Sequence, residues 1–508
     1  MRNGVLIPGQ TCWRIAHADK VAVIRDAATY FTQVKRAILA ARHSVLLIGW
    51  DFDTRIILDR DDPEPGIPNT LGDLLNYVVR HNKGLHVYVL RWDLAFLEVP
   101  LRGTTPLFLL NWLANPRLHF KLDGHHPDEA CHHQKIAVID DALAFCGGID
   151  ITLNRWDTPR HLDHDPRRTH PDGTPHGPWH DVTTAVHGDA ARALGDLARK
   201  RWYLATEQRI EPPPPGQTRW PDNLDAQFQD LDVAIARTEP AYGEQREAHE
   251  IEALYLAAIA AAERTIYLES QYFSGHRIAH AIMARLAEPH GPEIVIVNPR
   301  RAEGFLEEEA MGSARAILLE RCRAADRHHR LRFYTPVTEE RHDIYVHAKV
   351  LVIDDQLLRV GSSNINNRSM GLDTECDLAI EAQPHQTPTR RAILEVRDAL
   401  VAEHLGISRA TLDQTLQAHD GSLTQTLDQL IRPTGRSLES FTPPKLTPTE
   451  RRLGETHALD PSHPEPIDKT LLETLRVITP KWALIPAAAL AALAAALRLD
   501  TRRSKRRF

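Results

Sequence analysis

Two histidine and lysine pairs are the residues of this chain best suited to chemistry. The pattern His-x-Lys-x-x-x-x-Asp occurs twice, as His133, Lys135 and Asp140 and again as His347, Lys349 and Asp354. In each copy an apolar run separates the lysine from the aspartate, and a turn of small residues follows at the same distance from the histidine. Chance would have to reproduce all of these features, so the repeat predicts one active site built from two halves.

The residue types of the motif favour the cleavage of a phosphodiester. Residues two apart on a strand point to the same side, so each histidine should project beside its lysine. One neutral imidazole can attack phosphorus while the other, protonated, gives its proton to the leaving alcohol. Two ammonium groups would neutralise the nonbridging oxygens. This arrangement needs no cofactor, and we expect no metal.

The small-residue turns after the motifs supply candidate substrate-binding groups. In the second copy the turn contains Ser362 and Asn364, whose side chains we expect to donate hydrogen bonds to the phosphate. In the first copy Gly148 and Asp150 stand in the corresponding places. All four are candidate substrate-binding residues, and the phosphate contacts of the two halves should differ.

Length and composition limit the kind of protein. A chain of 508 residues with 42% hydrophobic content should form two or more globular domains. The formal charge of −7 argues against broad capture of nucleic acid. The five cysteines show no paired spacing, which predicts neither a zinc site nor a disulfide framework. The first residues lack the apolar core of a secretory signal, so a cytoplasmic location is expected.

A helix followed by an apolar strand precedes each motif, at 27–52 and at 250–273. Further helix and strand patterns alternate in both halves, which predicts α/β architecture with strands covered on both faces. We expect these domains: a first lobe at 1–210, a Pro-rich linker at 211–222, a second lobe with C-terminal helices at 223–432, a flexible linker at 433–470, and an Ala-rich apolar helix with a basic end at 471–508.

The C-terminal tail bears on the location of the chain. Its apolar run, 482–497, is shorter than the roughly 20 residues that span a bilayer, and basic residues follow it. A short anchor, a packed helix and an interfacial helix all fit this pattern. We expect a cytoplasmic protein that is peripheral or C-terminally anchored at the inner membrane.

A histidine-rich loop follows the first motif. The segment from His161 to His180 contains several histidines and aspartates, but their spacing matches no standard set of metal ligands. Its prolines and glycine make it irregular. A solvated loop is therefore the favoured interpretation, ahead of a metal site.

The paired motifs, followed by GGxD and by GSxNxxxRS, resemble the phospholipase D superfamily. The segment 346–381 is similar to bacterial phospholipases D and phosphatidyltransferases, and GGIDITLNRWDTPRH with the later GPWHDV resembles the phosphatidylcholine-type enzymes. The resemblance covers roughly residues 10–410. It implies two similar α/β/α sandwich lobes related by a pseudo-twofold axis, with the active site at their interface and a helical tail behind the second lobe.

The resemblance also implies roles for individual residues. His133 would be the nucleophile, forming a phosphohistidine, and His347 the general acid. A downstream carboxylate would hold each histidine, with Glu375 placed behind His347 and Asp181 behind His133. Asp140 and Asp354, at strand ends, would stabilise the fold.

The resemblance implies a substrate as well. The expected reaction removes phospholipid head groups to give phosphatidic acid or transfers the phosphatidyl group to another alcohol. The expected partners are phospholipid and a membrane surface, with no nucleic acid. A cardiolipin synthase-like phosphatidyltransferase, a nuclease of the same superfamily and a nonenzymatic membrane scaffold are the alternatives. An apolar rim of the cleft would favour lipid, and a long basic groove would favour nucleic acid.

Overall fold

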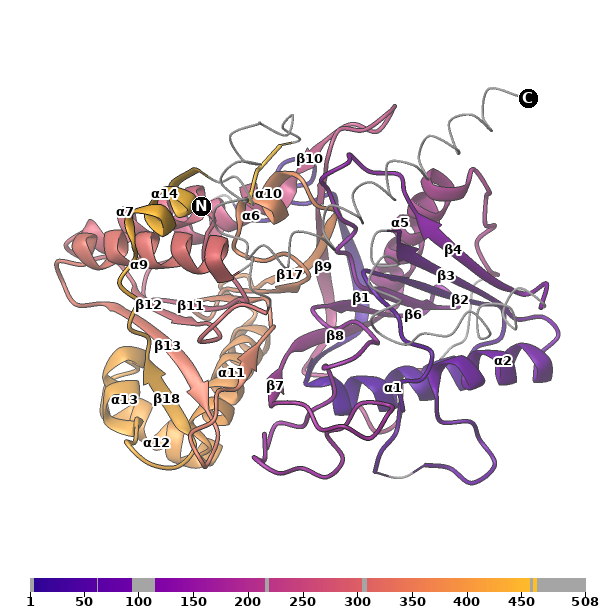
Figure 1. Ribbon diagram of the computed structural model, residues 1–508, viewed down its shortest axis with the longest axis horizontal. Helices are drawn as coiled ribbons and strands as arrows, with labels where there is room; N and C mark the ends of the chain where they lie inside the picture. Colours follow the sequence, from indigo (N-terminus) through magenta and orange to yellow (C-terminus); the bar gives the residue numbers. More distant parts are fainter. Residues whose placement is uncertain are drawn as a thin grey trace.

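One large mixed sheet runs through the protein and carries helices on both faces (Figure 1). The computed structural model describes residues 4–61, 63–93, 115–214, 219–303, 308–456 and 460–463. Within them, 16 strands form the large sheet and two short strands form a second one. The predicted α/β class is confirmed.

The first half supplies the indigo and purple elements of Figure 1. Its helix α1 begins directly after β1 and buries Tyr30, Phe31, Val34 and Ile38 at helical spacing, which packs it onto the sheet. The elements are β1 (Arg14–Arg25), α1 (Ala27–Ala40), β2 (Ser44–Gly49), α2 (Leu71–His81), β3 (His86–Trp92), β4 (Leu118–Asp123), β5 (Ile136–Ile139), β6 (Leu143–Gly147), β7 (Trp179–His180), β8 (Val182–His187) and α5 (Asp189–Thr206).

The second half supplies the pink to yellow elements. They are β9 (Phe228–Glu239), β10 (Ala248–His249), α6 (Glu250–Ala261), β11 (Thr265–Glu269), α7 (His276–Ala287), β12 (Glu293–Val297), the π-helix η2 (Glu308–Gly312), α9 (Ser313–Ala325), β13 (Leu331–Val337), β14 (Tyr345–Val346), β15 (Val350–Ile353), β16 (Leu357–Gly361), α10 (Asn367–Gly371), β17 (Glu375–Glu381), α11 (Thr387–Leu405), α12 (Arg409–Ala418), α13 (Leu423–Leu430), β18 (Ser437–Ser440) and α14 (Pro448–Thr456).

The order of strands is the same in both halves when it is read outward from the middle. The first half runs β1-β8-β6-β5-β2-β3-β4 and the second runs β9-β17-β16-β15-β11-β12-β13. In both, the outermost three of these strands are parallel to one another and the remaining neighbours are antiparallel. The antiparallel pairing of β1 with β9 joins the two sets into one sheet. The repeated order agrees with two similar lobes, and the pseudo-twofold axis itself stays a prediction.

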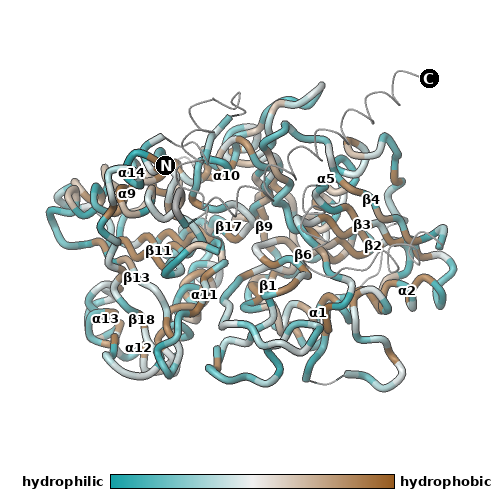
Figure 2. The backbone as a smooth tube through the Cα atoms, in the orientation of Figure 1, coloured by the Kyte–Doolittle hydropathy of each residue, from teal (hydrophilic) through white to brown (hydrophobic). Residues whose placement is uncertain are grey.

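The apolar strands next to the motifs form the core of each half (Figure 2). Every residue of β2, β5 and β6, and of β11, β15 and β16, is buried. Because both faces of these strands are covered, their sequences are mostly apolar rather than alternating, and the charged residues Glu269 of β11 and Arg359 of β16 are buried as well. The five cysteines are free thiols, and all but Cys131 are buried.

The prediction of a flexible linker at 433–470 is wrong for its first part. Strand β18 pairs antiparallel with β13 and extends the sheet at its edge, and α14 packs against α9. Asp460 is buried and accepts hydrogen bonds from the Ser274 hydroxyl and from the backbone N–H groups of Asn367 and Arg368. Proline and threonine are compatible with an edge strand and a short helix, so composition alone did not reveal this order.

The C-terminal tail, 471–508, lies outside the described residues, as does 215–218 of the Pro-rich linker. Of the helices within the described ranges, none has the length and apolar character needed to cross a membrane.

The aspartates that end the two motifs lock the same turn in each half. Asp140 accepts hydrogen bonds from three successive backbone N–H groups of the turn between α1 and β2, at 2.8 Å each. Asp354 accepts three from the turn between α6 and β11, at 2.7–2.8 Å. Both aspartates have left-handed backbone, with φ of 52° and 51°. Their geometry supports the structural role expected for them, because each ties a motif strand to the neighbouring helix and strand.

We therefore predict that Asp140→Asn and Asp354→Asn each lower the free energy of unfolding by about 1–3 kcal/mol, since a neutral amide replaces a buried carboxylate at several donors. Asparagine tolerates the left-handed backbone, which isolates the loss of charge. Denaturant titration measures the change. Asp355→Asn, which removes a partly exposed ion pair with Arg390, is the control and should cost less than about 1 kcal/mol. Equal effects at Asp354 and Asp355 would contradict the proposed role.

Candidate active site

Each histidine motif lies against the other half of the chain. The segment before β5 runs parallel to Thr374, and the His133 N–H donates to the Thr374 carbonyl at 2.9 Å. The segment before β15 contains β14, which pairs in parallel with β7 of the first half. There the His347 N–H donates to the His180 carbonyl at 2.8 Å. His133 is thus hydrogen-bonded to the residue before Glu375, and His347 to the residue before Asp181. Each of these carboxylates belongs to the opposite half.

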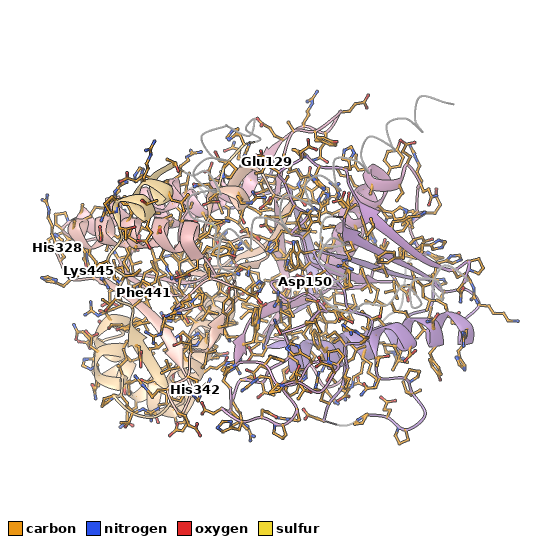
Figure 3. All side chains as sticks on the ribbon, in the orientation of Figure 1. Glu129, Asp150, His328, His342, Phe441 and Lys445 are labelled. Atoms are coloured by element: carbon orange, nitrogen blue, oxygen red, sulfur yellow. The ribbon has the colours of Figure 1, made fainter. Side chains whose placement is uncertain are left out.

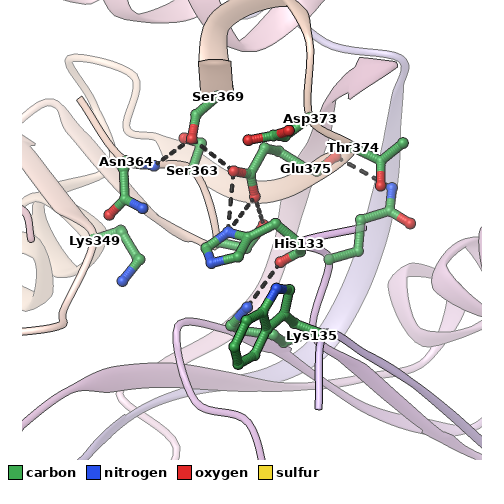
Figure 4. A network of polar contacts seen from close by, with 12 residues as sticks. His133, Lys135, Lys349, Ser363, Asn364, Ser369, Asp373, Thr374 and Glu375 are labelled. Carbon is green, nitrogen blue, oxygen red and sulfur yellow. Dashed lines mark hydrogen bonds and ion pairs between the residues drawn. The ribbon is translucent and has the colours of Figure 1, made fainter. Parts of the chain in front are cut away.

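His133 is held by Glu375 (Figure 4). Both carboxylate oxygens lie 3.1 Å from its Nδ1. Glu375 is fully buried and also accepts hydrogen bonds from the hydroxyls of Ser362, at 2.5 Å, and Ser369, at 2.7 Å. Burial alone would raise the pKa of Glu375, but His133, Lys135 and Ser362 outweigh it and lower the pKa. The carboxylate is therefore kept anionic behind the imidazole.

His347 is held by Asp181. The Asp181 Oδ2 lies 2.7 Å from its Nδ1, and both side chains are buried. The other oxygen of Asp181 accepts the Val182 N–H at 2.8 Å. Burial raises the pKa of Asp181, and burial together with the nearby Lys349 and Arg155 lowers the pKa of His347 well below its usual range. In the ligand-free protein His347 is therefore a neutral imidazole at pH 7.

The expected assignment of these carboxylates was wrong. The resemblance placed Asp181 behind His133 and Glu375 behind His347, within the same half in each case. The structure exchanges them, so that each histidine is held by a carboxylate from the opposite half. The crossed strand pairings cause this, because Thr374 and His180 each precede the carboxylate in sequence.

Each lysine lies beside its own histidine. Lys135 Nζ donates to the His133 carbonyl at 3.0 Å, and Lys349 Nζ donates to the His347 carbonyl. Lys135 also forms an ion pair with Asp150 at 3.0 Å. Burial lowers the pKa of Lys349 to about 7, with a further contribution from Lys135. Two cationic side chains are thus held close together in a buried place, which favours an anionic ligand.

Among the four candidate substrate-binding residues, three have other contacts. The Ser362 hydroxyl donates to Glu375 and accepts the Cys376 N–H at 3.0 Å. Asp150, which lies near the middle of the molecule in Figure 3, pairs with Lys135. Gly148 makes room for Asp181, because a Cβ there would overlap Asp181 Oδ1.

Asn364 is different. Its side-chain Oδ1 is buried and has no hydrogen-bond partner in the described structure, and its backbone N–H donates to Ser369. Figure 4 places Asn364 on the same side of His133 as Lys349. Its side-chain Nδ2 makes no hydrogen bond within the described residues, so this amide N–H group is the donor among the four that is left for a phosphate oxygen.

Three further residues lie near the site. Ser369 bridges Asn364 and Glu375. Trp179 lies with its ring centroid 5.3 Å from that of His347, and the Arg155 guanidinium stacks over Trp179 at 4.2 Å. The GSxNxxxRS pattern pointed to Ser369, but no local pattern marks Arg155.

A hollow of about 340 Å³ is lined in part by the stacked rings of Trp179 and Tyr345. Pro178 and Ile344 add apolar surface to its lining. Charged residues of both signs, including Arg300 and Asp343, also line it. The hollow is a mixed surface with an apolar wall and is not a basic groove.

The histidine-rich loop is solvated in its middle, as expected, but not at its ends. His164 is exposed, whereas His161 and His180 are fully buried. Arg168 is also buried and pairs with Asp157 at 3.2 Å. The two ends of the loop therefore lie among buried polar side chains, and exposed residues such as His164 lie between them.

Comparison with known proteins agrees with this site. The family model described as phospholipase D matches residues 320–453. Phospholipase D alpha 1 of Carica papaya is 26% identical over an alignment covering 73% of this chain and 63% of the relative, and phospholipase D1 of Schizosaccharomyces pombe is 24% identical, covering 81% and 38%. The chain thus spans less than two thirds of the length of these curated relatives.

A solved structure shares the fold. The phosphatidylserine synthase of Haemophilus influenzae Rd KW20 superposes with a TM-score of 0.52 at 14% identity, covering 80% of this chain and 95% of the synthase. The chain is thus similar in sequence to phospholipases D over most of its length and shares its fold with a phosphatidylserine synthase.

The crossed pairing predicts which residues are energetically coupled. In double-mutant cycles on the free energy of unfolding, His133→Ala with Glu375→Gln and His347→Ala with Asp181→Asn should each show a coupling of about 0.5–3 kcal/mol. The exchanged combinations, His133→Ala with Asp181→Asn and His347→Ala with Glu375→Gln, are the matched controls and should be additive within about 0.5 kcal/mol. Coupling in the exchanged combinations instead would contradict the crossed arrangement.

Proposed function

We propose that the protein is a phospholipase D-type phosphodiesterase. It removes the head group of a phospholipid to give phosphatidic acid, or transfers the phosphatidyl group to another alcohol, through a phosphohistidine intermediate. The observation that carries the proposal is the pair of motif histidines, each held at Nδ1 by a buried carboxylate of the opposite half. Because Nδ1 of each ring is engaged, Nε2 is the nitrogen left for the substrate.

Two steps follow from this geometry. In the first, Nε2 of His133 attacks phosphorus, the bond from phosphorus to the head-group oxygen breaks, and protonated His347 gives its proton to that oxygen. In the second, water or an alcohol transfers a proton to His347 and attacks phosphorus, which breaks the bond to His133. The same intermediate therefore serves hydrolysis and transfer. Glu375 stabilises the positive charge that His133 gains on attack.

Charge explains how His347 obtains its proton. In the ligand-free site burial and nearby cations disfavour the imidazolium. A bound phosphodiester brings a negative charge among these cations, which raises the pKa of His347 and of Lys349. The site is thus protonated most readily when the substrate is present. Lys135, Lys349 and the Asn364 amide are placed to contact the nonbridging oxygens.

The surroundings favour a lipid substrate over nucleic acid. The hollow next to Trp179, whose ring centroid lies 5.3 Å from that of His347, has an apolar wall of Trp179, Tyr345, Pro178 and Ile344. Its charged lining contains both signs, whereas a groove for nucleic acid is expected to be basic. The net charge of −7 points the same way. A phosphatidyltransferase of cardiolipin synthase type would use the same first step with a lipid alcohol as acceptor.

The proposal is tested by identifying products. Purified protein is incubated with vesicles of mixed phospholipids and a primary alcohol, and lipids are analysed by mass spectrometry. We expect phosphatidic acid and the phosphatidyl ester of the added alcohol. His133→Ala and His347→Ala should each reduce turnover by roughly 10³-fold or more, and His328→Ala, at an exposed site labelled in Figure 3, should leave it unchanged.

Two outcomes would count against the proposal. Near-normal turnover in either histidine variant would exclude the two-histidine mechanism. Cleavage of DNA together with no product from any lipid would favour the nuclease.

The depressed pKa values predict the pH dependence. Lys349, with its pKa lowered to about 7, and His347, with its pKa lowered further, carry their protons only on the acid side of these values. Hence kcat/KM should fall as the pH rises above the lowered pKa of His347, and more steeply above about 7, where Lys349 also loses its proton. The substrate's negative charge raises both pKa values, so kcat should fall at a higher pH than kcat/KM. Rates measured between about pH 5 and about pH 9 test this, and a kcat/KM that stays constant to about pH 9 would contradict it.

A further inference from the structure

A second cluster of titratable side chains lies behind Asp181 and takes no part in the reaction described above. It consists of Asp26, His161 and His180 of the first half and Glu403 of α11 in the second half. The four side chains are at most 1% exposed. One oxygen or nitrogen of each lies within 4.8 Å of the others. Two histidines and two carboxylates thus converge on one buried point.

Four distances between the histidine nitrogens and the carboxylate oxygens, with either oxygen of Asp26, are close to the edge length of a tetrahedron around a metal ion. His180 Nδ1 lies 2.9 Å from Glu403 Oε1 and 3.1 Å from Asp26 Oδ1. His161 Nε2 lies 3.2 Å from Glu403 Oε1 and 3.7 Å from Asp26 Oδ2. Ligands bound at about 2.0–2.1 Å in tetrahedral zinc sites are separated by about 3.3 Å. The observed spacing brackets this value.

Two atoms of the cluster have no hydrogen-bond partner in the described structure. Asp26 Oδ2 accepts no hydrogen bond, and His180 Nδ1 makes none in spite of its two close carboxylate neighbours. Both residues are fully buried. A buried polar atom without a partner is costly, so its presence calls for an unseen partner. Because Asp26 Oδ2 faces His161 and His180 Nδ1 faces Glu403, both atoms point into the space among the four side chains.

The remaining nitrogens of the two histidines are held as they are in metal sites. His161 Nδ1 lies 3.0 Å from Asp157 Oδ2, and His180 Nε2 lies 2.9 Å from Glu269 Oε2. Histidines that bind metals usually donate their other N–H to a carboxylate, which orients the ring. The other oxygen of Glu403 is paired with Arg25 at 2.7 Å. A second contact, with Asp157, Glu269 or Arg25, thus holds each of His161, His180 and Glu403 in its orientation.

We propose that Asp26, His161, His180 and Glu403 bind one divalent transition-metal ion, with zinc the best fit to two imidazoles and two carboxylates. Four protein ligands leave no open position, so the ion is structural and not catalytic. This site replaces the solvated interpretation for the two ends of the histidine-rich loop. It joins the first half to α11 of the second.

The ion would also position the carboxylate that holds His347. His180 immediately precedes Asp181, the Asp181 N–H donates to Asp26 Oδ1 at 3.1 Å, and the Asp26 N–H donates to the Asp181 carbonyl at 2.8 Å. Asp26 has a left-handed φ of 61°, an unusual backbone for this residue that its contacts must maintain. Two metal ligands thus fix the backbone of Asp181 from both sides.

Metal analysis of the full-length chain, purified without a polyhistidine tag or chelator, tests the proposal. Mass spectrometry of the metals should find close to one equivalent of zinc per chain. X-ray absorption at the zinc edge should show nitrogen and oxygen neighbours only, at about 2.0–2.1 Å. Asp26→Asn and Glu403→Gln should each lower the zinc content at least roughly tenfold, as expected when a ligand or its charge is lost. His342→Ala is the control and should keep it, because Asp163, Glu340 and His342 form a cluster of similar composition near the surface (Figure 3).

A ligand exchange keeps the test informative if these variants fail to fold. His161→Cys retains a zinc ligand and should add a sulfur neighbour at about 2.3 Å to the absorption spectrum. A spectrum without sulfur would overturn the assignment. Less than about a tenth of an equivalent of any transition metal in the natural chain, even after incubation with zinc, would also overturn it, and the cluster would then be two protonated imidazoles shared among carboxylates.

Discussion

The interaction on which this structure depends is the crossed contact of each motif histidine with a carboxylate from the other half of the chain. His133 meets Glu375, and His347 meets Asp181. Short parallel pairings bring each motif next to the opposite carboxylate, and the antiparallel contact of β1 with β9 holds the halves in the register that these pairings need. Asp140 and Asp354 then tie each motif strand to its own helix and strand. The site is a property of the interface and of neither half alone.

The two halves have the same strand order, but the charges around their lysines are balanced differently. Lys135 is balanced by Asp150, whereas the corresponding place in the second half is the neutral Asn364. Burial therefore affects the second half more, where the pKa values of Lys349 and His347 are depressed. The turns after the two motifs differ as well. Gly148 leaves the space that Asp181 fills, whereas Ser362 in the second half donates a hydrogen bond to Glu375. The first half thus has Gly148 in the place of Ser362, and its carboxylate is the shorter Asp181 in the place of Glu375.

The sequence predicted the parts that depend on local pattern. The repeated motif, the helix and strand before each copy and the buried strands were recognisable because spacing and apolar runs are local, and the resemblance to phospholipases D pointed to the carboxylates Glu375 and Asp181. The exchange of the carboxylates was not, since it depends on which segment lies beside Thr374 and His180 in space. The strands β1 and β9 also went unpredicted, although they join the halves. The buried ends of the histidine-rich loop were misjudged because distant partners, such as Glu403, decide their burial.

The crossed histidine–carboxylate contacts limit which substitutions either half of the chain can accept. In a symmetric pair of identical chains, each copy would lend its carboxylate to the other, and both contacts would have to be the same. Joining both motifs in one chain removes that requirement, and here one histidine meets a glutamate and the other an aspartate. The same crossed contacts also make each half dependent on the other. Exchanging one half for another would also replace the carboxylate that holds the histidine of the half that remains, so each motif depends on the other half.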